Sequence, residues 1–295
     1  MANLRENNKR RLWVWVISAL VFMLAFPILI SIMISQIKTG SAYLKESFGA
    51  EIADKILHER LLDAMRGQLG FSVKMAGAGI LAVISGIQGF SYLYSRKKMD
   101  FYMGVPVRRS KRFLIIWLNG ILLYAVPSFL GLLIEMLIAA GNGAMDVTVA
   151  YSALCGSLVN LAFYLGIYHI SLLAVMLTGN VIITCCGILV FFLYEFVVRW
   201  VLVGYQSFFF RYFDYYNTRT EPFFSPFTAY STLSTVFAFE NRIDPKSFAG
   251  LLLFAALTGA AAYLCYWKRP AETAGRAMTF DVTKPVIKIL LTIPA

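Results

Sequence analysis

Long apolar runs alternate with shorter polar segments along most of the chain. A helix needs about 20 mainly apolar residues to cross the hydrocarbon core of a bilayer, and six runs reach that length. Their predicted bounds are residues 12–37, 71–94, 114–140, 151–177, 181–204 and 247–267. The pattern predicts an all-α membrane protein, with a six-span transmembrane domain over residues 1–267 and a tail over residues 268–295.

Two longer segments are expected on the outer side. Between residues 38 and 70, apolar positions recur at helical spacing, which predicts either an amphipathic helix in the membrane interface or a solvated helix packed on the spans. Residues 205–246 are rich in Phe and Tyr, and short interfacial helices would place these rings at headgroup depth. The rings, among them Phe209, Phe210 and Tyr212, would form an outer gate or only an anchoring belt.

Charge is distributed unevenly over the predicted loops. The segments predicted inside hold 16 Lys and Arg against 4 Asp and Glu, whereas those predicted outside hold 9 Lys and Arg against 10 Asp and Glu. This asymmetry follows the positive-inside rule, so both termini are expected in the cytoplasm and the chain in the plasma membrane. It also explains the formal net charge of +11 without a basic groove for nucleic acid. With 59% hydrophobic residues, the chain does not fit an ordinary soluble domain.

The basic loop over residues 95–113 (SRKKMDFYMGVPVRRSKRF) is the most informative segment. Two clusters of Lys and Arg flank a centre that is mainly apolar and aromatic. A loop that only sets membrane topology needs the charges alone. The centre therefore predicts a short helix, ended by Pro106, that docks on a cytoplasmic partner.

Ionisable residues are identified within the spans at Glu135, Glu195 and Arg199. Such groups are costly in a bilayer and often mark a pathway or an ion pair. Glu195 and Arg199 are four residues apart on one helix face, so they can pair. Alternatively, Arg199 and Glu135 lie near outer helix ends and extend to the interface. His169 is expected to be a hydrogen-bonded core residue, and the four Cys to be small buried hydrophobes.

Motifs for nucleotide hydrolysis, metal binding or a catalytic nucleophile do not occur, such as G-x-x-x-x-G-K-[ST], H-E-x-x-H, C-x-x-C and G-x-S-x-G. The chain is therefore not expected to be an enzyme or to hold a metal or cofactor of its own. Any ATP hydrolysis linked to it must take place on another polypeptide.

The layout resembles the permease subunit of type-2 ABC exporters, with a basic loop after span two and a large outer segment before span six. The most specific likeness is that loop, where YSRKKMDFY at residues 94–102 and VPVRR at residues 105–109 are similar to multidrug-type permeases of Gram-positive anaerobes. SPF at residues 225–227 and KRPAETAG at residues 268–275 also resemble segments of that group. Met103-Gly104 departs from the group, which has a small hydroxyl residue or His followed by Leu.

This resemblance implies a membrane-spanning subunit of an ATP-driven ABC exporter for a lipophilic or peptide substrate. Cytoplasmic ABC ATPase subunits would bind it and carry ATP and Mg, and a second permease copy or a paralogue would complete the pathway. The coupling helix seated in the ATPase would contain Met99, Asp100, Phe101, Tyr102 and Met103.

Two other functions stay open from the sequence. A membrane-embedded lipid-modifying enzyme needs a polar cluster at membrane depth, and the available residues are Glu135, Glu195, Arg199, His169 and Asn160. A non-transporting membrane sensor or immunity protein would show no ATP-dependent transport. The apolar residues 286–295 are expected either to begin a further span that the chain does not complete or to close the chain as a short interfacial segment, and the first is favoured.

Overall fold

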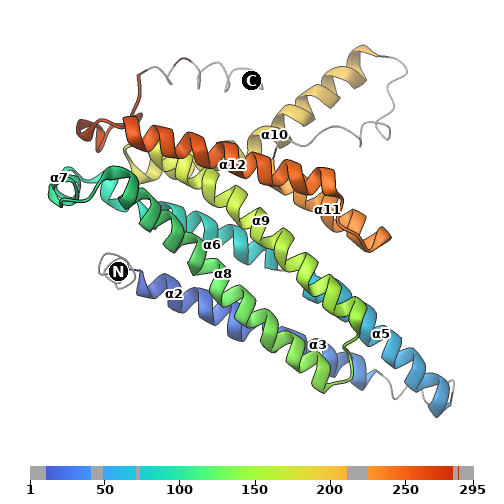
Figure 1. Cartoon of the computed structure of the whole chain (residues 1–295). Coiled ribbons are helices and arrows are strands. Elements are labelled where there is room, and N and C mark those ends of the chain that lie inside the picture. The colour runs from blue at the N-terminus through green and yellow to red at the C-terminus, as the bar shows by residue number, and fades with distance from the viewer. Residues whose placement is uncertain (1–10, 41–48, 71–73, 211–224, 282–284, 286–295) are drawn as a thin grey trace.

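The computed structural model describes residues 11–40, 49–70, 74–210, 225–281 and 285. Over these ranges long helices lie side by side in a bundle (Figure 1). The helices are α2 (Leu12–Ala19), η1 (Leu20–Ala25), α3 (Phe26–Thr39), α5 (Ala50–Gly70), α6 (Lys74–Gly89), η2 (Ser91–Tyr94), α7 (Arg96–Gly104), α8 (Arg109–Gly141), α9 (Val147–Leu177), α10 (Val181–Phe209), α11 (Pro226–Glu240), α12 (Pro245–Lys268) and η4 (Ala271–Thr273).

Five helical segments of the described chain are long and apolar enough to cross a membrane. They are Leu12–Thr39, Arg109–Gly141, Val147–Leu177, Val181–Phe209 and Pro245–Lys268. The predicted span at residues 71–94 contains α6, which has 16 described residues and ends at Gly89. The chain is thus an all-α, multi-pass membrane protein, whereas the sixth span, the cytoplasmic termini and the plasma membrane stay predictions.

The central helix of the bundle is α9. In its most apolar stretch, 78% of the residues are buried. In the corresponding stretches of α10 and α12 the share is 17%. Helix α9 packs against α5, α6, α10, α11 and α12, which is possible because its sequence is apolar on all sides. The helix begins at Asp146, whose carboxylate accepts the N–H of Val149 at 2.7 Å and so satisfies a free donor of the first turn.

The first span changes its helical pitch in the middle. A π-helical segment, η1, comes just before Pro27, and α3 then continues the span. In η1 the N–H of Phe26 donates to the carbonyl of Val21, five residues back. Pro27 has no N–H to give the carbonyl of Phe22 by the same pattern. The proline therefore disrupts the hydrogen-bond ladder, and the helix absorbs the disruption as a π segment.

A second core lies at the end of the bundle opposite α7 (Figure 1). It joins Ile30 of α3, Leu61 and Met65 of α5, Leu132 of α8 and Val149 of α9. The amphipathic face of α5 is therefore covered by the spans themselves. This packing supports the prediction of a helix packed on the spans over that of a free interfacial helix.

The second half of α10 diverges from the bundle (Figure 1). Phe209 and Phe210 at its end are exposed, and Tyr212 lies outside the described residues. Cys185 and Cys186 on α10 are exposed as well. The expectation that every Cys is buried was wrong for these two, because this helix presents most of its apolar surface outward.

Candidate functional site

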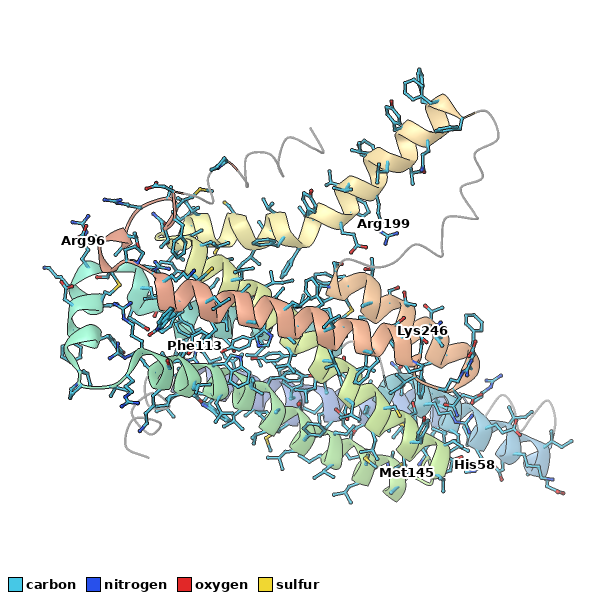
Figure 2. All side chains as sticks on the ribbon, turned by 45° about the horizontal axis from the view of Figure 1, so that its top comes forward. His58, Arg96, Phe113, Met145, Arg199 and Lys246 are labelled. Atoms are coloured by element: carbon cyan, nitrogen blue, oxygen red, sulfur yellow. The ribbon has the colours of Figure 1, made fainter. Side chains whose placement is uncertain are left out.

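The basic loop forms a short helix, α7, at the end of the bundle where α2 begins and α12 ends (Figures 1 and 2). It contains nine residues and follows Ser95, whose backbone is extended. Val105 returns to an extended conformation, as expected for a residue before proline, so the helix ends ahead of Pro106. The sequence thus predicted both the helix and its end.

The two faces of α7 differ in burial. Met99 is 1% exposed and anchors the helix to the bundle. The ring of Tyr102 is half-buried and stacks on Tyr92, with ring centroids 4.5 Å apart. Phe101 is 66% exposed, and Asp100 beside it is exposed too. Among the predicted coupling residues, Asp100 and Phe101 therefore present surface to a partner, and the side chain of Met103 lies outside the described part.

An aromatic layer beneath α7 connects it to α12. Tyr92 of η2 lies with its hydroxyl 3.0 Å from that of Tyr266 on α12. The ring of Tyr266 also contacts Phe90 and Phe113, with centroids 5.7 and 5.3 Å away. Tyr102 thus rests on a group of rings that extends to α8 and α12.

The side chains of two buried arginines donate hydrogen bonds to main-chain carbonyls of the surrounding segments. Arg112 of α8 donates to the carbonyl of Val105 at 3.2 Å, which fixes the loop after α7. Arg269, just after α12, donates to the carbonyls of Val175 at 2.7 Å and Met176 at 3.1 Å. These are carbonyls in the last turn of α9, where a positive charge also interacts favourably with the helix dipole. Burial lowers the pKa of Arg269 to about 10, so it remains charged at neutral pH.

The tail takes part in the same assembly. The N–H of Gly275 donates to the carbonyl of Gly179 at 2.8 Å, and the N–H of Gly179 donates to the carbonyl of Arg276 at 3.0 Å. The tail therefore lies against the turn between α9 and α10, and η4 contacts α7. Taken together, these contacts link the exposed surface of α7 to α8, α9 and α12.

Glu135 is paired across the bundle. Its Oε2 accepts a hydrogen bond from Nζ of Lys74 on α6 at 2.5 Å, and the two side chains are 1% and 11% exposed. The expectation that Glu135 extends to the interface was therefore wrong. Sequence reasoning missed Lys74, although a Lys near the start of a predicted span was a signal that Glu135 had a partner.

Glu195 and Arg199 form the predicted ion pair, at 2.8 Å between Nε and Oε1. The carboxylate of Glu195 also accepts hydrogen bonds from the hydroxyl of Thr228, at 3.1 and 3.0 Å. Since Thr228 lies in the first turn of α11, this cluster fastens α10 to the start of α11 just where α10 leaves the bundle.

His169 is a hydrogen-bonded core residue, as predicted. Its Nδ1 lies 2.7 Å from the carbonyl of Ala255 on α12, and its Nε2 accepts the indole N–H of Trp117 on α8 at 2.8 Å. A carbonyl can only accept, so Nδ1 carries the proton of the neutral ring. The imidazole is thus fully used in joining α8, α9 and α12.

The polar residues that an embedded enzyme would need do not meet. Glu135 contacts Lys74, Glu195 contacts Arg199 and Thr228, and His169 contacts Trp117 and Ala255. The amide of Asn160 accepts the hydroxyl hydrogen of Tyr230 at 2.9 Å. These contacts form four separate groups, and no group of three metal-binding side chains occurs among the described residues.

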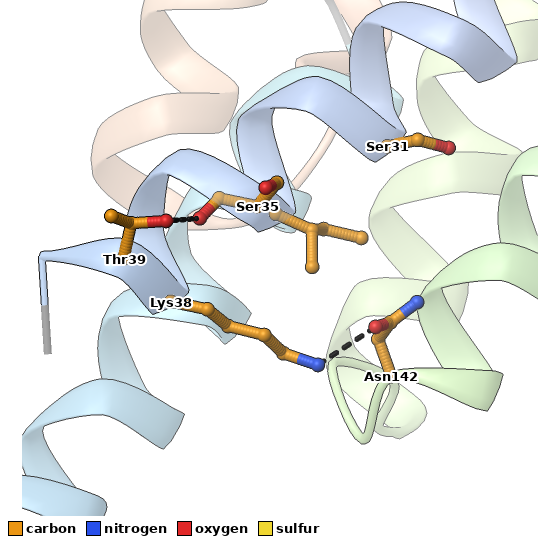
Figure 3. A pocket seen from close by; sticks show the side chains of 6 residues that line it. Ser31, Ser35, Lys38, Thr39 and Asn142 are labelled. Atoms are coloured by element: carbon orange, nitrogen blue, oxygen red, sulfur yellow. Dashed lines mark hydrogen bonds between the residues drawn. The ribbon is translucent and has the colours of Figure 1, made fainter.

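A cavity of about 520 Å³ opens at the far end of α3 (Figure 3). It is lined by Ser31, Ile34, Ser35, Lys38, Thr39 and Asn142. Nζ of Lys38 donates to Oδ1 of Asn142 at 2.7 Å across it. None of the predicted coupling or gating residues lines this cavity.

Comparisons with protein-family models, curated proteins and solved structures find no match to the chain. The resemblance to exporter permeases thus stays a prediction, and the features that bear on function are those of the α7 end.

Proposed function

We propose that this protein is the membrane-spanning subunit of an ATP-driven exporter, coupled through α7 to ATPase subunits on separate chains. The observation that carries the proposal is the asymmetry of α7. Met99 and Tyr102 dock the helix on the bundle, whereas Phe101 projects with 66% of its surface exposed, next to a cluster of exposed basic residues. An exposed ring on a firmly seated helix is suited to insertion into a groove of a partner.

The contacts around α7 supply a physical route for coupling. When ATP binding closes an ATPase pair, the seated helix is displaced as a unit because Met99 and Tyr102 hold it to the layer below. Arg112 transmits the displacement to α8, Tyr266 to α12 and Arg269 to α9. The spans then shift between two packed arrangements, which is a rigid-body transition driven by different contacts in each state.

In this proposal the pathway is completed by a second copy or a paralogue in the plasma membrane. The substrate class, lipophilic molecules or peptides, comes from the family resemblance and the apolar spans. ATP and Mg belong to the partner chains.

The test places a photo-reactive phenylalanine analogue at position 101 in cells that naturally make the protein, followed by mass spectrometry of the cross-linked products. We expect an ATPase subunit with a phosphate-binding loop. Position 147 is the matched control, because Val147 is 85% exposed at the opposite end of the bundle. Capture of the same ATPase from both positions, or of no ATPase from position 101, contradicts the proposal.

Function is tested by transport into vesicles that contain the co-purified complex. Phe101→Ala is expected to lower ATP-dependent transport by about tenfold or more, since truncating a buried interface ring typically costs above 1.4 kcal/mol. Phe239→Ala, at an 87% exposed site on α11, should leave it unchanged. Equal transport by the two variants contradicts coupling through Phe101.

A further inference from the structure

Arg11 lies just before α2, and its side chain enters the interior of the bundle with only 2% of its surface exposed. Nη2 donates to the carbonyl of Ser85 on α6 at 2.8 Å, and Nη1 donates to the carbonyl of Ile116 on α8 at 3.4 Å. The hydroxyl of Tyr168 on α9 is a further neighbour. These partners are all neutral, so the guanidinium charge has no carboxylate beside it among the described residues.

Burying an unpaired charge is expensive, because the neutral dipoles of carbonyls replace hydration only in part. The packing of α6 nevertheless leaves space for the guanidinium of Arg11. A Cβ atom at Gly89 of α6 would collide with Nη2 of Arg11. The absence of a side chain at Gly89 leaves the space that the guanidinium occupies beside α6.

Three buried hydrogen-bond donor atoms, one on Arg11 itself, one on α2 and one on α8, lack acceptors in the described structure. They are Nε of Arg11, Nε1 of Trp15 and Nδ2 of Asn119. Asn119 is 0% exposed, so solvent does not reach it. Oδ1 of Asn119 has no partner either and would have to face away from an anion.

These donors come from segments that the hydrogen bonds hold side by side. Arg11 bonds to Ile116, and the hydroxyl of Ser18 bonds to the carbonyl of Leu123 at 2.7 Å. Both pairs have a sequence separation of 105, so α2 and α8 run parallel in a constant register. Trp15 and Asn119 therefore lie between two fixed contacts, one turn along from Arg11 and Ile116 respectively.

We propose that Arg11, Trp15 and Asn119 bind a small inorganic anion between α2 and α8, with chloride as the ion in cells. One anion would balance the charge of the guanidinium and would also accept hydrogen bonds from the donors that have no acceptor. The ion must be small because the surroundings are close-packed: a Cβ at Gly120 would collide with the hydroxyl of Tyr168. The site does not depend on the exporter proposal.

The probe is chloride itself, added to the purified full chain in detergent. Thermal unfolding is compared in sodium chloride and sodium gluconate at equal ionic strength, since gluconate is too large for the site. We expect chloride to raise Tm by about 3 °C or more, with saturation as its concentration increases. Equal Tm values in the two salts overturn the proposal.

Variants assign the effect to the site. Trp15→Phe removes an indole N–H, and Asn119→Leu removes the amide at similar volume, so both should lose the chloride shift. Trp13→Phe is the matched control on the same helix, because Trp13 is 51% exposed, and it should keep the shift. A full chloride shift in both site variants overturns the proposal.

A bromide soak gives a direct readout that does not depend on stability. Crystals of the full chain should show an anomalous peak beside Arg11. Bromide peaks that lie only elsewhere on the protein overturn the assignment.

Discussion

Lys74 and Glu135 illustrate how much a single partner matters in this bundle. Both side chains are nearly inaccessible to solvent, and each supplies the counter-charge of the other. A buried ion pair is not in itself strongly stabilising, because the Coulomb attraction mostly offsets the cost of desolvation. The large effect is expected when one member is removed, since the other then remains buried without a counter-charge.

Lys74→Met is predicted to destabilise the protein by about 3–5 kcal/mol because it leaves Glu135 unpaired. Thermal unfolding in detergent measures the change. The double variant Lys74→Met with Glu135→Met removes both charges, so it should recover most of the lost stability. If the single variant unfolds at the temperature of the unchanged protein, the pair does not form.

The contact between η1 and α8 shows how one helix accommodates an irregularity in another. The carbonyl of Phe22 points at Gly131 of α8, where a Cβ would collide with the carbonyl oxygen. Pro27 cannot supply this carbonyl with an N–H donor in the π-helical pattern. Close approach of Gly131 therefore packs α8 against the one turn of the first span that the proline disrupts.

Gly131→Ala is predicted to lower stability by about 1–3 kcal/mol, because the added methyl meets backbone and not a flexible side chain. Gly141→Ala in the same helix is the matched control. No atom lies within 4 Å of a Cβ at Gly141, so alanine should be neutral or stabilise by up to about 1 kcal/mol. Equal unfolding temperatures for the two variants would show that the helices do not approach at Gly131.

At the scale of the whole molecule, the two ends of the bundle differ in charge and in architecture. The α7 end carries exposed basic residues over buried arginines, whereas the opposite end carries α5 and the mixed charges around it. The positive-inside rule then orients the bundle with α7 toward the cytoplasm. This orientation is a prediction that chemistry on intact cells can test.

Single cysteines are introduced for this test into a chain whose four natural Cys are replaced by Ala. Val147→Cys is predicted to react with a membrane-impermeant maleimide in intact cells, because position 147 is 85% exposed at the outer end. Lys97→Cys, on exposed α7, should react only after permeabilisation. Labelling is read by gel shift, and the opposite pattern would reverse the orientation.

The sequence alone determined the features that depend on neighbours along the chain. Five of the six predicted spans correspond to the long apolar helices, since length and hydrophobicity are local properties. The helix ending before Pro106 and the pair of Glu195 with Arg199 follow from rules that span a few residues. These interactions are encoded within one turn, so they were readable without a fold.

Only the tertiary structure decided which apolar faces are buried and which polar groups meet. In a membrane protein both the core and the lipid-facing surface are apolar, so hydrophobicity does not tell them apart. For this reason the burial of Met99 and the exposure of Cys185 were not readable from sequence. Lys74 is 61 residues from Glu135, and Arg11 is 105 from Ile116, so such contacts exist only once the helices have packed.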